Sequence, residues 1–180
     1  SSNTTWGLLS SPYVVTGNVL LNEGITLTIE PGVTVKVNSD LYIKVEGILI
    51  AVGTSDNKIT ITSNESNPEK ADWKYILFKN SDTVFDSDYE YQSGNILKYC
   101  EISYAKYALI IYNSSIYVDN SILENNTSGI DFDVITKSLF SNNIIRNNTQ
   151  ATSLNGLSDN GSNDTYKDVL WLSNIIKNNT

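Results

Sequence analysis

Apolar and polar residues alternate in short runs along the first third of the chain. The run Val33–Val37 alternates with a period of two, and Leu41–Val45 and Ile59–Ile61 repeat this pattern. A period of two is typical of β-strands, whose successive side chains point to opposite faces. Turns that contain glycine separate the runs, and no stretch has the helical period of about 3.6 residues. The sequence therefore predicts an all-β fold.

A repeated phrase begins near Tyr99 and returns through the rest of the chain. Its anchoring isoleucines recur at intervals of 20, 22 and 31 residues: Ile102, Ile122, Ile144 and Ile175. A period of roughly 20 residues that tolerates an insertion is typical of a solenoid, in which each repeat buries its apolar face against the next. Because the phrase is built of β-formers and ends in asparagine, we predict stacked coils of a parallel β-helix, with these isoleucines in one inward column.

Asparagines close each repeat at the expected turn. Asn125, Asn147 and Asn178 are predicted to stack as a ladder, because amide groups at strand spacing can donate and accept along the stack. Ala105 holds the same place in the first repeat and should interrupt the ladder. Cys100 aligns with Asn120, and a small buried residue is expected there, because no basic partner for a reactive thiol is evident.

Three segments resemble the opening coils of secreted right-handed parallel β-helix proteins with a pectate-lyase-like fold: Gly24–Val37, Leu41–Thr54 and Ile59–Ser63. Such proteins occur among the cell-surface and adhesin-like proteins of bacteria and archaea. The resemblance implies a right-handed, single-stranded parallel β-helix in a secreted protein displayed at a cell surface. It carries no catalytic residues to this chain, because the fold hosts lyases, hydrolases, adhesins and spacers alike.

The chain reads as one domain with a short leading segment. Residues 1–12 are expected to be an N-terminal cap or a segment exchanged with a neighbouring subunit, and residues 13–180 the β-helix. Trp6, Leu8 and Leu9 would cover a strand edge in either case. Polar stretches predict surface loops at about 64–70, 81–93 and 154–167.

Composition narrows the classes of partner. The net charge is −8 and the pI about 4.4, which argues against nucleic acid or an anionic membrane surface. The chain has no histidine and one cysteine, so no intrachain disulfide forms, and no cofactor is expected beyond Ca²⁺. No apolar run is long enough to cross a bilayer. A start at Ser1 without methionine suits a processed secreted protein and a trimmed one equally.

Two acidic groups are candidates for chemistry. Asp131 and Asp133 lie two apart, so both should face outward from one strand, and Arg146, the only arginine, follows about one coil later. Lyases of this fold use outward carboxylates and a basic residue on acidic polysaccharides. The plainer interpretation is a solvated strand face with one salt bridge, so no catalytic residue is assigned.

The second acidic group lies in the loop at 81–93. Its members could hold Ca²⁺ through hard oxygen ligands, although their spacing is not that of an EF-hand: Asp82, Asp86, Asp88 and Glu90. Tyrosines in and after this loop could stack on sugars, although alternation should bury about half of them. Among these are Tyr89, Tyr91 and Tyr117.

Several asparagines occupy Asn-x-Ser/Thr sequons. Those expected in exposed turns, and therefore possible glycosylation sites, are Asn3, Asn64, Asn113, Asn160 and Asn163. An exported glycoprotein would explain them. An asparagine-rich solenoid would produce the same sequons by chance.

The last repeat contains Trp171, Ile175 and Asn178, and the sequence stops just after it. An uncapped coil exposes unpaired strand edges, so we expect either that the sequence is truncated or that a partner covers the edge. If the partner is another copy, it stacks head to tail, with Trp6, Leu8 and Leu9 at the opposite end. The expected role is structural: a surface-layer or filament subunit, or an adhesin stalk, whose partner is itself or another surface protein. The alternative is a carbohydrate-binding or polysaccharide-cleaving module.

Overall fold

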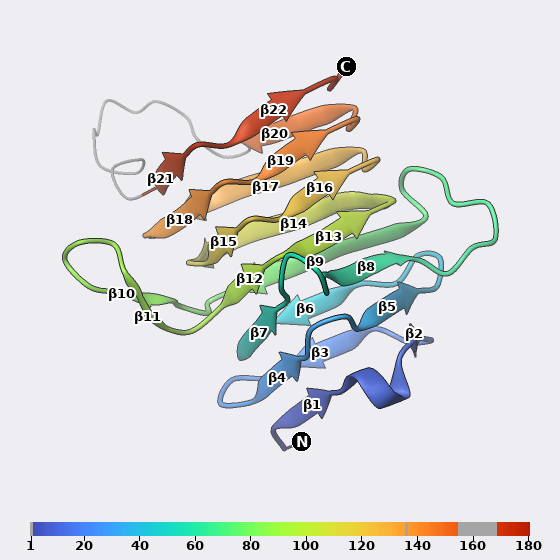
Figure 1. Ribbon diagram of the computed structural model, residues 1–180, viewed down its shortest axis with the longest axis horizontal. Coiled ribbons are helices and arrows are strands. Elements are labelled where there is room, and N and C mark those ends of the chain that lie inside the picture. The colour runs from blue at the N-terminus through green and yellow to red at the C-terminus, as the bar shows by residue number, and fades with distance from the viewer. Residues whose placement is uncertain (1, 136, 155–168) are drawn as a thin grey trace.

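The computed structural model describes residues 2–135, 137–154 and 169–180. Short parallel strands stack into three sheets, and each coil of the chain contributes one strand to each sheet before it rises to the next (Figure 1). The stack runs from the N-terminus at one end to the C-terminus at the other. The predicted all-β parallel β-helix is confirmed, and its handedness stays a prediction.

The three sheets are defined by their strands in order along the stack. The first sheet contains β1 (Thr4–Trp6), β4 (Thr26–Ile29), β7 (Ile48–Val52), β12 (Ile96–Lys98), β15 (Tyr117–Asp119), β18 (Ser138–Ser141) and β21 (Val169–Leu172). The second sheet contains β2 (Tyr13–Val15), β5 (Thr34–Val37), β8 (Ile59–Ser63), β13 (Cys100–Ser103), β16 (Ile122–Glu124), β19 (Ile144–Arg146) and β22 (Ile175–Lys177). The third sheet contains β3 (Val19–Leu21), β6 (Ile43–Val45), β9 (Trp73–Lys79), β14 (Ala105–Ser114), β17 (Ser128–Ile135) and β20 (Gln150–Leu154).

The leading segment joins the helix rather than standing apart from it. Strand β1, which lies inside the segment expected to be a cap, pairs in parallel with β4. The ring of Trp6 stacks on Tyr13 with centroids 5.0 Å apart. The 3-10 turn η1 (Leu8–Ser10) follows, with Leu8 and Leu9 exposed.

One inward column shows that the repeated phrase was aligned one residue out of register. In the structure Ile102 pairs with Leu123, and Leu123 with Ile145, and all three are fully buried. Ile122 and Ile144 therefore point outward, and the predicted isoleucine column is wrong. The cause is Tyr99, which takes the left-handed conformation (φ 50°) that Asn120 takes in the next coil (φ 49°). Tyrosine is unusual in the left-handed region, so the equivalence of Tyr99 and Asn120 is not recognisable from the sequence.

The asparagine ladder is displaced by the same single residue. Asn125, Asn147 and Asn178 have φ values of 56°, 56° and 55° and make the turns. The hydrogen-bonded ladder is formed by the residue after each of them. The Nδ2 of Asn126 donates to Asn148 Oδ1 at 3.1 Å, and the Nδ2 of Asn148 donates to Asn179 Oδ1 at 3.1 Å. Buried turn amides need an acceptor, and this inner ladder supplies it.

Both ladders in the later coils end on smaller residues. Ala105 closes the inner ladder, because its N–H donates to Asn126 Oδ1 at 2.8 Å. A second ladder runs through Asn143, whose Oδ1 accepts the N–H of Ser121 at 2.9 Å. Ser121, not Asn120, occupies the register of Cys100, and its Oγ accepts the Cys100 N–H at 3.0 Å. Burial raises the pKa of the Cys100 thiol to about 12, so the expected buried cysteine is confirmed.

Candidate binding groove

A hairpin leaves the coil between β9 and β12 and projects beside the first sheet. It consists of the antiparallel strands β10 (Val84–Phe85) and β11 (Tyr91–Ser93), at the left of Figure 1. A hollow of about 470 Å³ separates the hairpin from the outer face of the first sheet. We call it the hairpin groove. It is lined by Asp88, Tyr89, Glu90, Tyr91, Lys98, Tyr117, Asp119, Leu139, Ser141, Asn142, Leu170 and Leu172.

The floor of the hairpin groove consists of two columns of outward side chains. Strand register places Tyr117, Leu139 and Leu170 in one column, which is mainly apolar. The same register places Lys98, Asp119, Ser141 and Leu172 in the neighbouring column, which is mainly polar. Because the residue between them on each strand points into the core, the floor is one apolar strip beside one polar strip.

Asp119 fixes the centre of the polar strip. Its carboxylate accepts hydrogen bonds from Ser141 Oγ at 2.8 Å and from Asn142 Nδ2 at 3.1 Å, and its Oδ2 lies 3.0 Å from Lys98 Nζ. Burial alone would raise the pKa of Asp119, but these hydrogen bonds and one from Asn120 outweigh it and lower the pKa. The hydrogen bond to Asp119 in turn raises the pKa of Lys98. The strip therefore carries a fixed, mutually neutralised ion pair.

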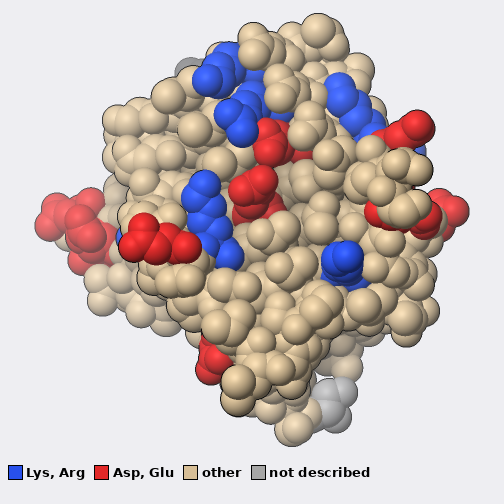
Figure 2. All heavy atoms as spheres, turned by 45° about the vertical axis from the view of Figure 1, so that its right-hand side comes forward, with Lys and Arg blue, Asp and Glu red and all other residues tan. Residues whose placement is uncertain are grey.

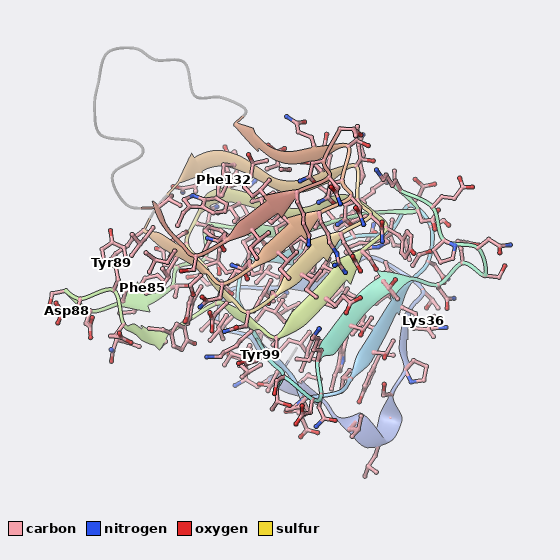
Figure 3. The ribbon with its side chains drawn as sticks, turned by 45° about the horizontal axis from the view of Figure 1, so that its top comes forward. Lys36, Phe85, Asp88, Tyr89, Tyr99 and Phe132 are labelled. Carbon is pink, nitrogen blue, oxygen red and sulfur yellow. The ribbon has the colours of Figure 1, made fainter. Side chains whose placement is uncertain are left out.

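Aromatic rings form the wall. Tyr117 lies with its ring centroid 5.8 Å from Tyr91 and 6.2 Å from Phe85. Lys137 holds the hairpin from outside the groove: its Nζ lies 4.2 Å from the ring centroid of Tyr89 and donates to the carbonyl of Asp86 at 2.8 Å. Figure 3 shows Phe85, Asp88 and Tyr89 together on the projecting hairpin. Burial raises the pKa of Tyr91.

Buried polar groups anchor the base of the hairpin to the coil. Asn95 is fully buried, and its Oδ1 accepts the N–H of Leu49 at 2.9 Å. Thr83 Oγ1 accepts the N–H of Asn95 at 3.0 Å and donates to the carbonyl of Ser115 at 2.9 Å. Gly94 has φ 103°, and a Cβ there would lie 2.6 Å from the Asp82 carbonyl. The wall is therefore tied to the floor by satisfied buried hydrogen bonds.

In the loop at 81–93, the carboxylate of Asp86 stabilises the turn. Asp86 Oδ1 accepts the N–H groups of Asp88 and Glu90, both at 2.9 Å, and its Oδ2 accepts from Gln92 Nε2 at 3.1 Å. Among the residues that the structure describes, no group of three or more histidine, cysteine, aspartate or glutamate side chains could hold a metal ion. Calcium binding stays a prediction.

The proposed catalytic trio is not brought together. Asp131 lies in β17 of the third sheet, where it is buried rather than solvated. Asp133 pairs in register with Tyr112 on the same sheet. Arg146 lies in β19 of the second sheet, with its Nε 2.6 Å from Glu124 Oε2. Arg146 therefore lies on a different sheet from the two aspartates and pairs with Glu124.

The remaining candidates lie apart from the hairpin groove. Asn3 Oδ1 accepts the N–H of Thr26 at 2.9 Å, Asn64 Nδ2 donates to Asn38 at 2.8 Å, and Asn113 Nδ2 donates to Asn80 at 2.9 Å. All three sequon asparagines are exposed, and their glycosylation stays a prediction. Two further sequon candidates, Asn160 and Asn163, lie outside the described residues.

The assembly candidates at the C-terminal end belong to the last described coil. Trp171 continues an inward column and stacks on Phe140 at 4.8 Å, yet it is 37% exposed. Ile175 is outward and 51% exposed, and Asn178 makes a turn. No helix in the described part of the chain is long and apolar enough to span a membrane.

Comparison with known proteins supports the fold and leaves the groove unassigned. Residues 2–80 match the family model described as a pectate-lyase like beta helix domain, which confirms the expected resemblance for less than half of the chain. Protein bark beetle of Drosophila melanogaster is 38% identical over 56 residues, which is 31% of this chain and 2% of that protein. The chain thus spans a very small part of that relative. No solved structure matches significantly.

Sequence reasoning found part of the groove. The sequence indicates Tyr89, Tyr91 and Tyr117 as rings that could stack on sugars, and all three line the groove. Lys98 and Asp119 were missed, because they become neighbours only when strands from successive coils are placed in register. Their interval of 21 residues, close to that of the repeat, was the signal that could have paired them.

Proposed function

We propose that this β-helix is an extracellular carbohydrate-binding module and that the hairpin groove is its site. The observation that carries the proposal is the juxtaposition of aromatic rings with an apolar strip and a preset polar strip in one hollow. Binding sites for small ligands are typically apolar and aromatic surfaces with a few fixed polar groups. A sugar offers an apolar face for Tyr117 and hydroxyl groups for the Asp119 strip. The extracellular location rests on the resemblance to secreted β-helix proteins.

We propose that the hairpin groove binds glycans and does not cleave them. A general acid works best when its pKa lies near the operating pH. The pKa of Asp119 is lowered, and its oxygens accept hydrogen bonds from Ser141, Asn142 and Asn120. Such a carboxylate, only 3% exposed, is a poor proton donor, and it positions Lys98 and Asn142 for contact with ligand hydroxyls.

Replacing Tyr117 tests the proposal. Tyr117→Leu keeps apolar volume but removes the ring, and we expect binding of a glycan identified on an array to weaken ~10-fold, equivalent to about 1.4 kcal/mol. Tyr75→Leu is the matched control, because Tyr75 stacks on Tyr42 at 5.2 Å on the third sheet, away from the groove. Chemical-shift mapping on the unaltered protein gives a second readout. Shifts confined to other faces, or equal losses in the two variants, would refute the proposal.

A structural role is the second candidate, favoured by the last described coil. Trp171 and Ile176 continue inward columns but are 37% and 54% exposed. A second copy stacked head to tail would cover them, as in a filament. We expect negative-stain images of the full-length protein to show fibres, and Ile176→Lys to abolish them. Isolated short rods would assign this face to further coils of the same chain instead.

A further inference from the structure

The charges around the hairpin groove do not balance. Among the described residues that line it, Lys98 is the one cation, and it is paired with Asp119 at 3.0 Å. Asp88 and Glu90 also line the groove, and both are exposed. Lys137 does not line the hollow, but its Nζ lies 4.2 Å from the ring centroid of Tyr89 and offsets one of the four acidic charges of the hairpin segment, Asp82, Asp86, Asp88 and Glu90. The groove therefore carries a negative rim above a neutral floor.

The same imbalance is visible on the surface. In Figure 2 carboxylates gather on the projection at the left-hand edge, the side on which Figure 1 shows the hairpin. The hairpin segment from Asp82 to Glu90 contains acidic residues and no lysine or arginine. Repulsion from such a rim acts over roughly 10 Å at 0.1 M salt.

An anionic glycan meets two obstacles in this groove. Its carboxylates would approach Asp88 and Glu90, which repel them. At Lys98 it would meet a charge that Asp119, 3.0 Å away, already offsets, so the ion pair gives it no net attraction. Like-charge contacts of this kind are a usual means by which a site rejects the wrong ligand. A neutral sugar meets neither obstacle, because its hydroxyls can bond to the ion pair as it stands.

We infer, resting on the proposed function, that the hairpin groove selects glycans built of uncharged sugars and rejects polyuronates. Asp88 and Glu90 are the specificity-determining residues. Asp119 keeps Lys98 from serving as a carboxylate receptor. The ligand class follows from the charges at the site rather than from the net charge of the chain.

Charge reversal at the rim tests this inference. Neutral hexose oligosaccharides and oligogalacturonates of matched length are titrated into the full chain at low and moderate salt. We expect the best neutral oligosaccharide to bind at least ~10-fold more tightly than oligogalacturonate at low salt, and moderate salt to narrow the ratio. The variant Asp88→Lys/Glu90→Lys should reduce the ratio ~10-fold or more. The control Glu23→Lys/Glu69→Lys makes the same change in net charge at exposed residues elsewhere, and should leave the ratio within about twofold.

The outcomes separate the inference from the proposed function. Equal or tighter binding of oligogalacturonate, lost in Tyr117→Leu, would overturn the inference and leave a carbohydrate-binding groove. An equal response of the two double variants would also overturn it, because net charge alone would then explain selection. Absence of binding to every glycan on the array would overturn the proposed function and, with it, the inference.

Discussion

The early and the later coils build the same cross-section in two ways. In the early coils, up to Ile61, the described interior is aliphatic, with Val33, Val35 and Val37 fully buried and no buried polar side chain among residues 2–62. In the later coils, from Asn95 onward, amide and hydroxyl side chains are buried at several corners. The later corners therefore use buried side chains, whereas the early corners use backbone groups and exposed side chains such as those of Asn3 and Asn18.

Close backbone approach replaces the ladder in the early coils. The N–H of Gly47 donates to the carbonyl of Leu21, and that of Ile48 to the carbonyl of Ile25, both at 2.9 Å. A Cβ at Gly47 would lie 2.2 Å from the Ile25 carbonyl, so only glycine allows this contact. In the later coils a buried asparagine side chain takes this place, as at Asn126 and Asn148. The family match ends at residue 80, before the ladders begin.

The largest expected effect is the loss of one ladder amide. Asn148 is fully buried, accepts the N–H of Asn126 at 2.9 Å and donates to the carbonyl of Leu123 at 3.0 Å. Asn148→Leu leaves both backbone groups without partners, so we expect the free energy of unfolding to fall by about 3 kcal/mol. Denaturant titration measures it. Asn147→Gly, at the neighbouring turn residue, is the control and should cost under ~0.5 kcal/mol.

Gly47→Ala tests the close backbone contact between coils in the early region. The added Cβ must push the Ile25 carbonyl away, and we expect a loss of about 2 kcal/mol in the free energy of unfolding. Hydrogen exchange should place the damage in the early coils, with the ladder amides of the later coils still protected. Uniform loss of protection would mean that the early and the later coils unfold as one unit, and they could then not be treated as two regions of different stability.

The dependence of stability on pH should arise mainly in the later coils, where folding shifts the pKa values of Glu101 and Asp119 in opposite directions. Burial and the neighbouring Glu124 raise the pKa of Glu101 above its ordinary 4.5, so its contribution to stability falls as the pH rises through the folded pKa. The pKa of Asp119 is held below its ordinary 3.8, so its contribution is present above that value and lost as the pH falls through the folded pKa.

We therefore expect Glu101→Gln to raise the free energy of unfolding at about pH 7 and Asp119→Asn to lower it, with both differences shrinking below about pH 4. Urea titrations at the two pH values measure this. If both variants behaved alike at neutral pH, the opposite signs assigned to the two groups would be wrong.

The smallest expected effect concerns a turn. Tyr99 occupies the left-handed position that asparagine holds at Asn120 and Asn142. Tyr99→Asn should stabilise the protein by about 0.5 kcal/mol, because asparagine tolerates this conformation better. The reverse change, Asn120→Tyr, should lower the free energy of unfolding by a similar amount. A loss on Tyr99→Asn would show that the ring of Tyr99, 5.8 Å from Lys98 Nζ, contributes more than the strain costs.

The sequence predicted what depended on local pattern. Alternation located the strands between Tyr13 and Ser63, and the repeated phrase predicted the solenoid. It failed by one residue at Tyr99 and Tyr104, because tyrosines there hold conformations that the later coils give to asparagine. The groove could not be predicted from the sequence for a different reason. Lys98 and Asp119 meet only through cross-coil register, and the hairpin that faces them is an insertion without periodicity.

The length of the groove floor is set by the number of strands that stack beneath it. Its polar column takes one residue from each of four successive strands, β12, β15, β18 and β21, and its apolar column one from each of the last three, so its length is counted in coils. Duplicating the coil that contains β18 and β19 would lengthen the floor by one strand spacing, about 4.8 Å, while leaving the hairpin, Tyr117 and Asp119 in place. A chain of this design can therefore change the length of the ligand it accommodates in whole steps.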